Sequence, residues 1–449
     1  MKRLSWFLCL SLLLGCLTGC RGGGVAVYDS AGEVIATPTS MEFSAEQLTD
    51  EMYDSYVRTV LNEAVVVLQE VYDYRADEAE RALFRGDFAV YTAADSAVFE
   101  AIAEMYGAYA AEGLPLGCAV TDLHGGLCAV YSGGEEAYAL EKRSPHSAMK
   151  PLSVYAPAME KGLIDWSTRV TDKPYKQIKT ETGTVRDWPV NPSGGYTYKN
   201  TTLYECVRQS LNTAAVACLS KLTVTDSLSF LQDAFGMELS YEQNAAALYG
   251  EEEVIGNLAL GSLYEGITPA QLAGYYQMFG NGGQYQRPCA IREIRDRNGK
   301  VVYTYTPAPK QVLSEDTAYI MNRLLQGVVR PGGTGDAARF GNVPLVGKTG
   351  TGSMEEGDNW FVGVTPQYSC AVWHGIGAGV GAGENIAARL FAEIFAKIPS
   401  QTVTDFPRCA TVRKVICCSE SGLEYTDACG RMQIGYYAAD RVPTVCTEH

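Results

Sequence analysis

Positive charge is scarce in this sequence. There are 36 Lys and Arg residues against 52 Asp and Glu residues, so the formal net charge is −16 at pH 7. Binding to phosphate backbones needs clustered Lys and Arg, and we find no such cluster, which argues against a nucleic-acid partner. The composition also lacks the bias of a disordered or collagen-like chain. With 449 residues, 47% of them hydrophobic, the chain can form one large or two modest globular cores.

Long apolar runs are also missing. The one pronounced run follows a short basic start and ends at about Leu14, which is too short to span a bilayer comfortably. It is typical of a secretory signal over residues 1–19, and the tetrad "LTGC" ending at Cys20 resembles a bacterial lipobox. We therefore expect Cys20 to carry a lipid that anchors the protein at the outer face of the cytoplasmic membrane, with residues 20–43 as a tether. Cleavage at Cys16, an ordinary signal peptide and an uncleaved anchor are the alternatives.

The 14 cysteines are many for an exported bacterial protein. Export normally permits disulfides, but their pairing cannot be read from a sequence. In the tail, residues 400–449, Cys418, Cys429 and Cys446 could form a metal site with His449, yet their spacings match no familiar zinc pattern. We expect disulfides or free thiols there, and no metal or organic cofactor.

The pattern of apolar residues predicts an α+β protein. Two early hairpin strands, "LGCAVTD" and "LCAVYSGG", and three late strands, "VPLVGKTGTG", "NWFVGVTP" and "YSCAVWHG", can complete one antiparallel sheet with helices packed against it. The middle of the chain is mostly helical, and residues 164–201 are expected to be loop. Further helices are expected at about 44–74, 96–110, 203–222, 268–280, 314–325 and 384–398, with a hairpin turned at Asn298-Gly299.

Three short motifs on separate elements supply the groups for acyl transfer without histidine. Ser147 and Lys150 lie in "SAMK" at the start of an apolar helix, Ser210 to Asn212 read "SLN", and Lys348 to Thr351 read "KTGT". Each motif occurs once. Together and in this order they are the motif set of serine β-lactamases and penicillin-binding proteins.

Each motif residue has a chemical role in this interpretation. Ser147 and Lys150 share one helix face, and a Lys150 that is desolvated near a second cation, Lys348, should have a lowered pKa and act as the base on Ser147. The N–H groups of Ser147 and Thr351 can hold an oxyanion. Ser210 would relay a proton towards the leaving amine.

The remaining motif residues are expected to bind substrate. Asn212 could hold a substrate amide, while Lys348 and the hydroxyls of Thr349 and Thr351, with Gly350 between them, suit a terminal carboxylate. The expected substrate therefore ends in a free carboxylate.

From about Asp87 to Cys370 the sequence resembles the transpeptidase domain of class A penicillin-binding proteins. Beyond the motifs, "VYTAAD", "NLALGSLYEGITPAQLAGYYQMFGNGG", "GGTGDAAR" and "DNWFVGVTP" are similar to that family's text, in its order. The resemblance implies a β-lactamase/transpeptidase-like fold over residues 87–399 and a helical segment at 44–86 ahead of it. It also implies an acyl-enzyme formed from the D-Ala-D-Ala end of peptidoglycan stem peptides, and inhibition by β-lactams.

Two departures from the family pattern stand out. Residues 21–86 are too few for the glycosyltransferase domain of class A enzymes, so we expect a monofunctional transpeptidase that works beside a separate glycan polymerase. The family's usual Pro-Gly before the nucleophile is Pro145-His146 here. His146 could line the site, or it could be exposed or cap a helix. Pro151 and Pro157 predict a kinked nucleophile helix.

Three other functions compete with transpeptidation. A D,D-carboxypeptidase differs only in using water as the acceptor. A serine β-lactamase would need a deacylating carboxylate, for which Glu253 in "EVIGN" is the nearest candidate. A non-catalytic, lipid-anchored protein that binds β-lactams or muropeptides belongs to another class, but the presence of every motif side chain argues against it.

Overall fold

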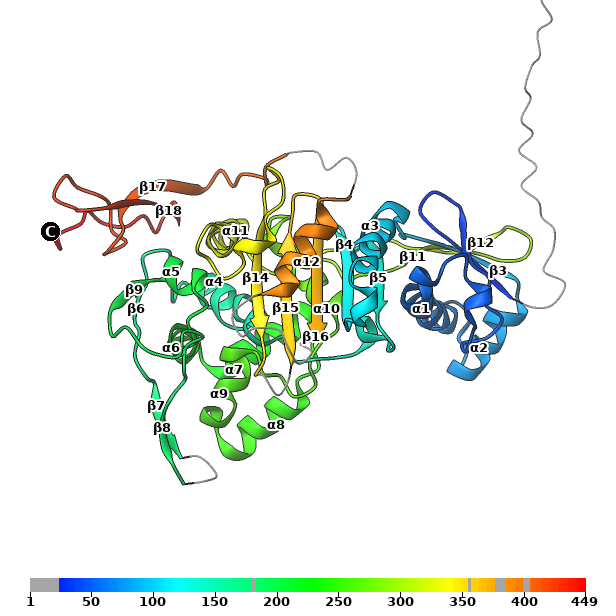
Figure 1. Ribbon diagram of the computed structural model, residues 1–449, viewed down its shortest axis with the longest axis horizontal. Coiled ribbons are helices and arrows are strands. Elements are labelled where there is room, and N and C mark those ends of the chain that lie inside the picture. Colours follow the sequence, from blue (N-terminus) through cyan, green and yellow to red (C-terminus); the bar gives the residue numbers. More distant parts are fainter. Residues whose placement is uncertain (1–23, 180–182, 354–356, 376–384, 399–403) are drawn as a thin grey trace, which may run out of the picture.

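A five-stranded antiparallel sheet lies at the centre of the protein (Figure 1). The computed structural model describes residues 24–179, 183–353, 357–375, 385–398 and 404–449, so the predicted signal peptide and Cys20 lie outside the described residues. The strand order is β14-β15-β16-β4-β5. Its strands are β4 (Leu116–Asp122), β5 (Leu127–Gly133), β14 (Val346–Thr351), β15 (Asp358–Val364) and β16 (Tyr368–Gly375). The predicted pairing of early and late strands is confirmed, through β4 and β16.

Helices cover both faces of this sheet because successive side chains of its strands alternate between two cores. On β15, Trp360 and Val362 enter the core shared with α10 (Pro269–Tyr276). Phe361 points to the opposite face and packs with α12 (Ile386–Phe395). The sheet is therefore buried on both sides, and its edge strand β14 faces the helical part of the chain.

The helical lobe beside β14 supplies the other two motifs. Its helices are α4 (Ala156–Glu160), α5 (Leu203–Arg208), α6 (Asn212–Leu222), α7 (Val224–Phe235), α8 (Ser240–Tyr249), α9 (Glu251–Leu260) and α11 (Glu315–Val329). The expected helix over 203–222 is broken at Ser210, whose φ is +54°. Within the described part of the chain no single helix is long and apolar enough to cross a bilayer; α6 and α7 meet that test only as a pair bent by 88°.

The prediction of a loop over residues 164–201 is partly wrong. This segment holds four short strands: β6 (Arg169–Thr171), β7 (Lys176–Lys179), β8 (Val185–Trp188) and β9 (Asn200–Thr202). β7 pairs with β8 as a hairpin that projects from the lobe, and β6 pairs with β9. Their mostly polar, half-exposed side chains gave no alternating apolar pattern, so backbone pairing alone defines them.

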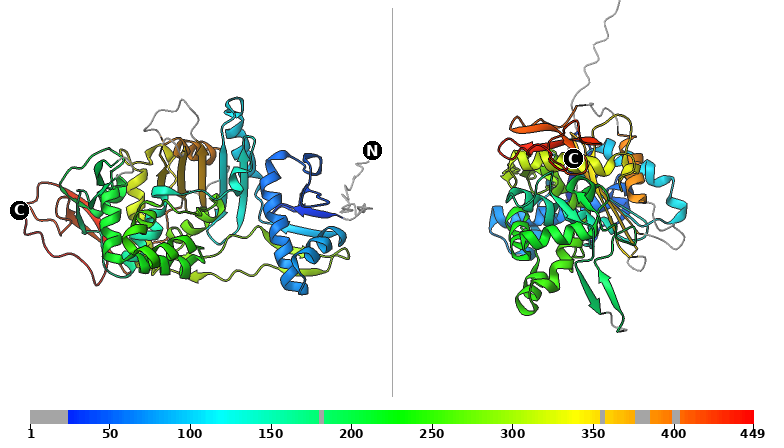
Figure 2. Two further views of the ribbon diagram at one scale, coloured as in Figure 1. Left: turned by 90° about the horizontal axis from the view of Figure 1, so that it is seen from below. Right: turned by 90° about the vertical axis from the view of Figure 1, so that its left-hand side faces the viewer.

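A second five-stranded sheet, in the order β12-β11-β3-β1-β2, lies at the far end of the molecule from the C-terminal hairpin (Figures 1 and 2). Its strands are β1 (Val25–Tyr28), β2 (Val34–Ala36), β3 (Phe88–Thr92), β11 (Ile291–Arg295) and β12 (Val301–Thr304). Against it pack α1 (Asp54–Tyr72) and α2 (Ala76–Arg85), while α3 (Ser96–Gly107) covers the central sheet.

This second sheet corrects the expected tether over 20–43. Val25 to Tyr28 pair in parallel with Phe88 to Tyr91, so this part of the predicted tether is a buried strand. The hairpin turned at Asn298-Gly299 is confirmed and belongs to the same sheet. Segments from both sides of the predicted boundary at residue 87 therefore share one sheet.

The C-terminal module, residues 404–449, contains one antiparallel hairpin of β17 (Val412–Cys418) and β18 (Met432–Ala438). It packs against α11 at the end of the helical lobe (Figure 1). Tyr437 is buried there, where its hydroxyl donates to the Gly422 carbonyl 2.8 Å away and contacts Ser167. A short two-stranded pair, β10 (Gln284–Tyr285) with β13 (Lys310–Gln311), completes the strands described.

Candidate active site

The nucleophile candidate, Ser147, lies in an irregular helix between the central sheet and the helical lobe. The chain forms a 3₁₀ turn, η5 (His146–Met149), then a π-helical turn, η6 (Pro151–Tyr155), and only then α4. Pro151 and Pro157 each lack an N–H for the ordinary α-helical ladder, which accounts for the irregularity that the sequence predicts. Ser147 is half-buried in this turn, and its neighbours on either side are buried.

The loop before Ser147 has a left-handed residue. His146 has a φ of +48°, a conformation for which glycine has the lowest cost and which His tolerates better than β-branched residues. Its N–H donates to the Gly261 carbonyl at 3.0 Å, and a Cβ on Gly261 would lie 1.9 Å from the His146 carbonyl oxygen. Close packing against Gly261 therefore fixes the backbone that presents Ser147.

His146 is buried, so the alternative in which it is exposed is wrong. Its Nε2 lies 3.3 Å from Oδ2 of Asp358, whose other oxygen accepts a 2.7 Å hydrogen bond from the Trp373 indole. Asp358 is the first residue of β15 and is buried. The pair His146–Asp358 links the nucleophile loop to the central sheet.

The edge strand β14 approaches this loop very closely. A Cβ on Gly350 would lie 2.3 Å from the Pro145 carbonyl oxygen and 3.3 Å from the Ala148 Cβ. Only glycine permits that approach, which explains a glycine at this point of the "KTGT" strand. The strand carrying Lys348, Thr349 and Thr351 is thereby held against the turn carrying Ser147.

Lys150 is fully buried and makes three hydrogen bonds. Its ammonium donates to the Ser210 carbonyl (2.8 Å), the Ser210 hydroxyl (3.3 Å) and Oδ1 of Asn212 (2.6 Å). Among the described residues, the Ser147 hydroxyl makes no hydrogen bond. The expected Ser147–Lys150 contact is thus replaced by contacts to the "SLN" motif, as is common before substrate tightens a site.

Lys348 also donates a hydrogen bond to the Ser210 hydroxyl. Its ammonium donates to Oγ of Ser210 at 2.8 Å and to the Thr349 carbonyl at 3.1 Å. A hydroxyl has two lone pairs and one hydrogen, so two lysine donors fill its acceptor sites and leave its hydrogen free to donate elsewhere. The left-handed φ of Ser210 places its carbonyl and hydroxyl on the two lysines, at a cost in backbone strain.

Burial sets the charge state of both lysines. Desolvation lowers the pKa of Lys348 to about 7. For Lys150, desolvation and then the nearby positive charge of Lys348 lower the pKa well below 10.5. The lowered pKa of Lys150 and both of its causes agree with the sequence interpretation.

The side chain of Asn212 is held by protein groups at both ends. Its Oδ1 accepts from Lys150, and its Nδ2 donates to the Val190 carbonyl at 2.6 Å. Behind it, Oδ1 of Asn191 accepts from the Asn212 N–H at 2.9 Å and so caps α6. Sequence analysis did not identify Asn191, because it lies in the segment expected to be loop.

A further hydroxyl lies at the "KTGT" strand. Oγ of Thr334 is 2.9 Å from Oγ of Thr349, and the Thr334 N–H donates to the Arg208 carbonyl at 3.3 Å. Thr334 belongs to the segment "GGTGDAAR" that resembles family text, which is the signal that could have identified it. The hydroxyls of Thr334 and Thr349 are therefore in contact at β14.

Glu253, the carboxylate considered for a β-lactamase, is exposed in the first turn of α9. Its backbone N–H donates to the Gly250 carbonyl at 3.2 Å. Among the described residues, no side-chain hydrogen bond or ion pair joins Glu253 to the turn that carries Ser147.

Comparisons with known proteins agree with the fold. The model of the penicillin binding protein transpeptidase domain matches residues 135–396, more than half of the chain. Penicillin-binding protein 1A of Clostridium acetobutylicum is 37% identical over 236 residues, which are 52% of this chain and 28% of that protein. Penicillin-binding protein 1F of Bacillus subtilis is 34% identical over 239 residues, 52% of this chain and 30% of that one. The chain thus spans less than a third of the length of these relatives.

Solved structures support the fold alone. The D,D-transpeptidase domain of a peptidoglycan glycosyltransferase from Eggerthella lenta superposes with a TM-score of 0.61 at 17% identity, covering 84% of this chain and 98% of that one. Penicillin-binding protein A of Mycobacterium tuberculosis, solved as an imipenem acyl-enzyme complex, gives 0.65 at 15% identity, covering 84% and 99%. With the family model covering more than half of its length, this chain belongs to the penicillin-binding protein transpeptidase family.

Proposed function

We propose that this protein is a serine D,D-transpeptidase that cross-links peptidoglycan stem peptides. The observation that carries the proposal is the Ser210 hydroxyl, which accepts hydrogen bonds from two buried lysines beside the turn that holds Ser147. Such a cluster supplies a base, a proton relay and a cation without histidine or metal.

In the acylation step, Oγ of Ser147 attacks the carbonyl carbon between the two terminal D-Ala residues of a stem peptide. Its proton passes to the neutral amine of Lys150, a form that burial favours by lowering the pKa of this lysine. The N–H groups of Ser147 and Thr351 stabilise the oxyanion. When the C–N bond breaks, the free hydrogen of Ser210 protonates the leaving amine, and Lys150 returns its proton to Ser210.

Substrate binding uses the β14 strand. The substrate carboxylate pairs with protonated Lys348 and with the hydroxyls of Thr349 and Thr351, while Asn212 exchanges one of its internal hydrogen bonds for a substrate amide. An amine on a neighbouring strand then attacks the ester and loses its proton to Lys150. As the acyl C–O bond breaks, Lys150 passes that proton to Oγ of Ser147. A β-lactam enters by the same first step and stays bound as an ester.

Intact mass spectrometry of the purified protein after exposure to a penicillin tests this assignment. We expect a lasting adduct of one penicillin in the wild type and none in Ser147→Ala. Ser144→Ala is the matched control, because that hydroxyl lies three residues away and donates only to the Gly261 carbonyl. Drug turnover without an adduct would favour a β-lactamase, and neither adduct nor turnover would favour a non-catalytic binding protein. A stem-peptide substrate then distinguishes the two remaining activities. A transpeptidase joins the peptide to an acceptor amine, whereas a carboxypeptidase releases it as a free acid.

We also propose a lipid anchor on Cys20 and cooperation with a separate glycan polymerase. Cys20 follows a lipobox-like tetrad, and the matched transpeptidase region, residues 135–396, is only part of the relatives' length. Cys20→Ala should lose labelled fatty acid and accumulate unprocessed chain. Normal cross-linking in cells without every other peptidoglycan synthase would contradict the dependence on a polymerase.

A further inference from the structure

The C-terminal module has almost no apolar core of its own. Its buried cluster consists of Cys418, Cys429 and Cys446, with the half-buried Leu423 and Tyr425 packed around them. Large apolar side chains on the same hairpin are left outside: Met432 is 68% exposed and Ile416 56%. A unit of about 46 residues with so little buried apolar surface is close to the size at which disulfides or a metal are usually needed.

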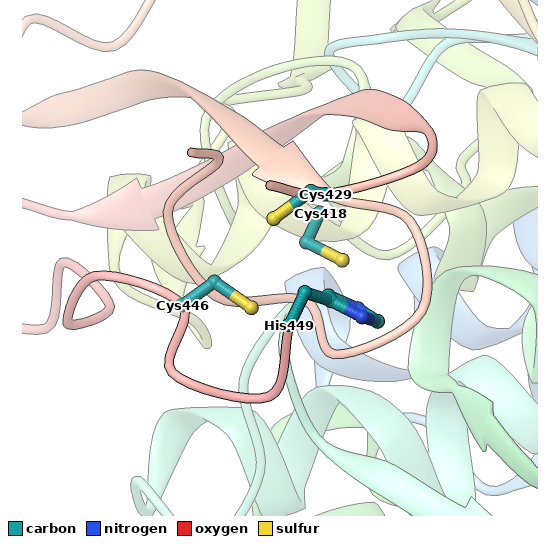
Figure 3. Close-up of side chains that lie close together, drawn as sticks. All are labelled: Cys418, Cys429, Cys446 and His449. Atoms are coloured by element: carbon teal, nitrogen blue, oxygen red, sulfur yellow. The ribbon is translucent and has the colours of Figure 1, made fainter. Parts of the chain in front are cut away.

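The three thiols lie together with one imidazole. The ligand atoms of Cys418, Cys429, Cys446 and His449 are all within 4.8 Å of one another, and the three cysteines are buried (Figure 3). Around a tetrahedral zinc ion, with Zn–S near 2.3 Å and Zn–N near 2.0 Å, ligand atoms are about 3.5 to 3.8 Å apart. Shifts of about 1 Å would therefore complete a site of this kind.

Successive side chains of β17 point to opposite sides, so only one of its two adjacent cysteines faces the cluster. Cys417 points towards the helical lobe, where its sulfur lies 3.1 Å from the Tyr437 hydroxyl. Cys418 points the other way, into the cluster. Successive strand residues face opposite sides, so the two cysteines cannot share one site.

Hydrogen bonds hold the loops that carry the other ligands. The Cys446 N–H donates to the Glu424 carbonyl at 2.9 Å, and the Cys418 N–H donates to the Leu423 carbonyl at 2.7 Å. The Thr426 N–H donates to Sγ of Cys429 at 3.4 Å. A carboxylate oxygen of Glu420 lies 3.7 Å from Nε2 of His449, where it can orient the ring.

From this geometry we propose that Cys418, Cys429, Cys446 and His449 bind one Zn²⁺ ion. Three thiolates and one imidazole form a soft, four-coordinate set that suits zinc and leaves no open position for a substrate. The site is therefore structural, and it supplies the stability that the module lacks. This proposal replaces the expectation of disulfides or free thiols. The spacings in the sequence matched no familiar zinc pattern, because only the fold brings the four residues together.

An odd number of thiols disfavours a disulfide as the explanation of this cluster. One disulfide would use two of the three sulfurs and leave the third beside His449 with no partner. All eleven cysteines of the described residues are unpaired. Metal binding uses all three thiols at once.

The ion would also strengthen the contact between the module and the transpeptidase domain. Glu448, between Cys446 and His449 in the chain, pairs with Arg169 at 2.8 Å. Arg441 donates to the carbonyl of Met159, in the helix that continues the nucleophile turn, at 3.3 Å. Fixing the last loop therefore fixes these two contacts.

Metal analysis of the full-length protein, purified in detergent without added metal or chelator, tests the site. We expect about one zinc per chain in the wild type and almost none in Cys418→Ser or Cys429→Ser. Cys409→Ser is the matched control, because that thiol lies in the same module but contacts Thr411 and Asp316 instead. The control should keep its zinc.

A second measurement on the wild type covers the case in which the serine variants do not fold. After exchange with Co²⁺ alone, the folded protein should show the visible bands of tetrahedral cobalt and thiolate-to-cobalt charge transfer. A thiol reagent should release about one ion per chain once the three ligand thiols have reacted. A disulfide between any two of the three cysteines in the native protein, or a protein that takes up no Zn²⁺ or Co²⁺ with its thiols reduced, would overturn the proposal.

Discussion

The ammonium nitrogen of Lys348 lies 2.8 Å from the hydroxyl oxygen of Ser210, and neither side chain is exposed. Because burial lowers the pKa of Lys348 to about 7, this lysine loses its proton close to neutral pH. Its charge, which we assign to binding a carboxylate, is present below that pH and is lost above it. The same pKa thus makes substrate capture depend on pH.

Acylation of the wild type by a penicillin should therefore slow as the pH rises through about 7, measured as the second-order rate with a fluorescent penicillin. Lys150, whose pKa is also lowered, is the base and must be neutral, so it sets the acidic limb of the profile. Lys348→Arg keeps its charge at every pH tested and should lose the alkaline limb. A wild-type rate that stays constant from pH about 6 to 9 would contradict this assignment.

Ser210→Ala should slow acylation by about 100-fold or more, because it removes the proton relay and leaves two buried lysines without their shared acceptor. The folded structure should persist, since the Lys150 ammonium keeps its bonds to the backbone carbonyl of residue 210 and to Asn212. Ser220→Ala, on the exposed side of α6, is the control and should react at the wild-type rate. Equal rates in the two variants would remove Ser210 from the chemistry.

His146→Gly should keep penicillin acylation, whereas His146→Ala should slow it and lower the melting temperature further. Glycine adopts the φ of +48° freely, but alanine there costs about 1 kcal/mol. Both variants lose the contact to Asp358, so their difference isolates the backbone requirement. If alanine and glycine behave alike, the left-handed turn is not what positions Ser147.

Gly350→Ala should abolish or strongly slow acylation. The new Cβ would meet the Pro145 carbonyl at 2.3 Å, so β14 must move away from the nucleophile turn. Overpacking of this kind typically costs about 1 to 3 kcal/mol, which thermal unfolding can measure beside the acylation rate. Gly107→Ala, where a Cβ would meet nothing within 4 Å, is the control.

Local sequence signals predicted much of the fold correctly. Thr268 and Gln271 form a capping box at the start of α10, within the helix expected at about 268–280, and Asn298-Gly299 turns the expected hairpin. Each of these features is decided by neighbours in the chain, so the sequence contains the information. The break at Ser210 was missed, since it is stabilised by bonds to Lys150 and Lys348, which lie far away in sequence.

The site was predicted as a set of residues, but its bonding was not. The motifs correctly predicted a desolvated Lys150 whose pKa is lowered by burial and by the nearby charge of Lys348. The lowered pKa of Lys348 itself was not predicted. The motifs could not show that Lys150 forms its hydrogen bonds with Ser210 and Asn212 instead of Ser147. That choice depends on side-chain positions across three elements. Thr334 and Asn191 were missed for the same reason: each acts through a partner on another element.

The order of strands in the central sheet also has a consequence for how the chain folds. β4 is followed in the chain by β5, yet its other neighbour is β16, and the bonded residues Thr121 and Ser369 are 248 positions apart. Closing so long a loop makes folding slow, and until it closes β4 exposes an unpaired edge. The nascent chain therefore cannot complete this sheet before β16 has been synthesised, and variants shortened ahead of Gly375 should aggregate instead of folding in part.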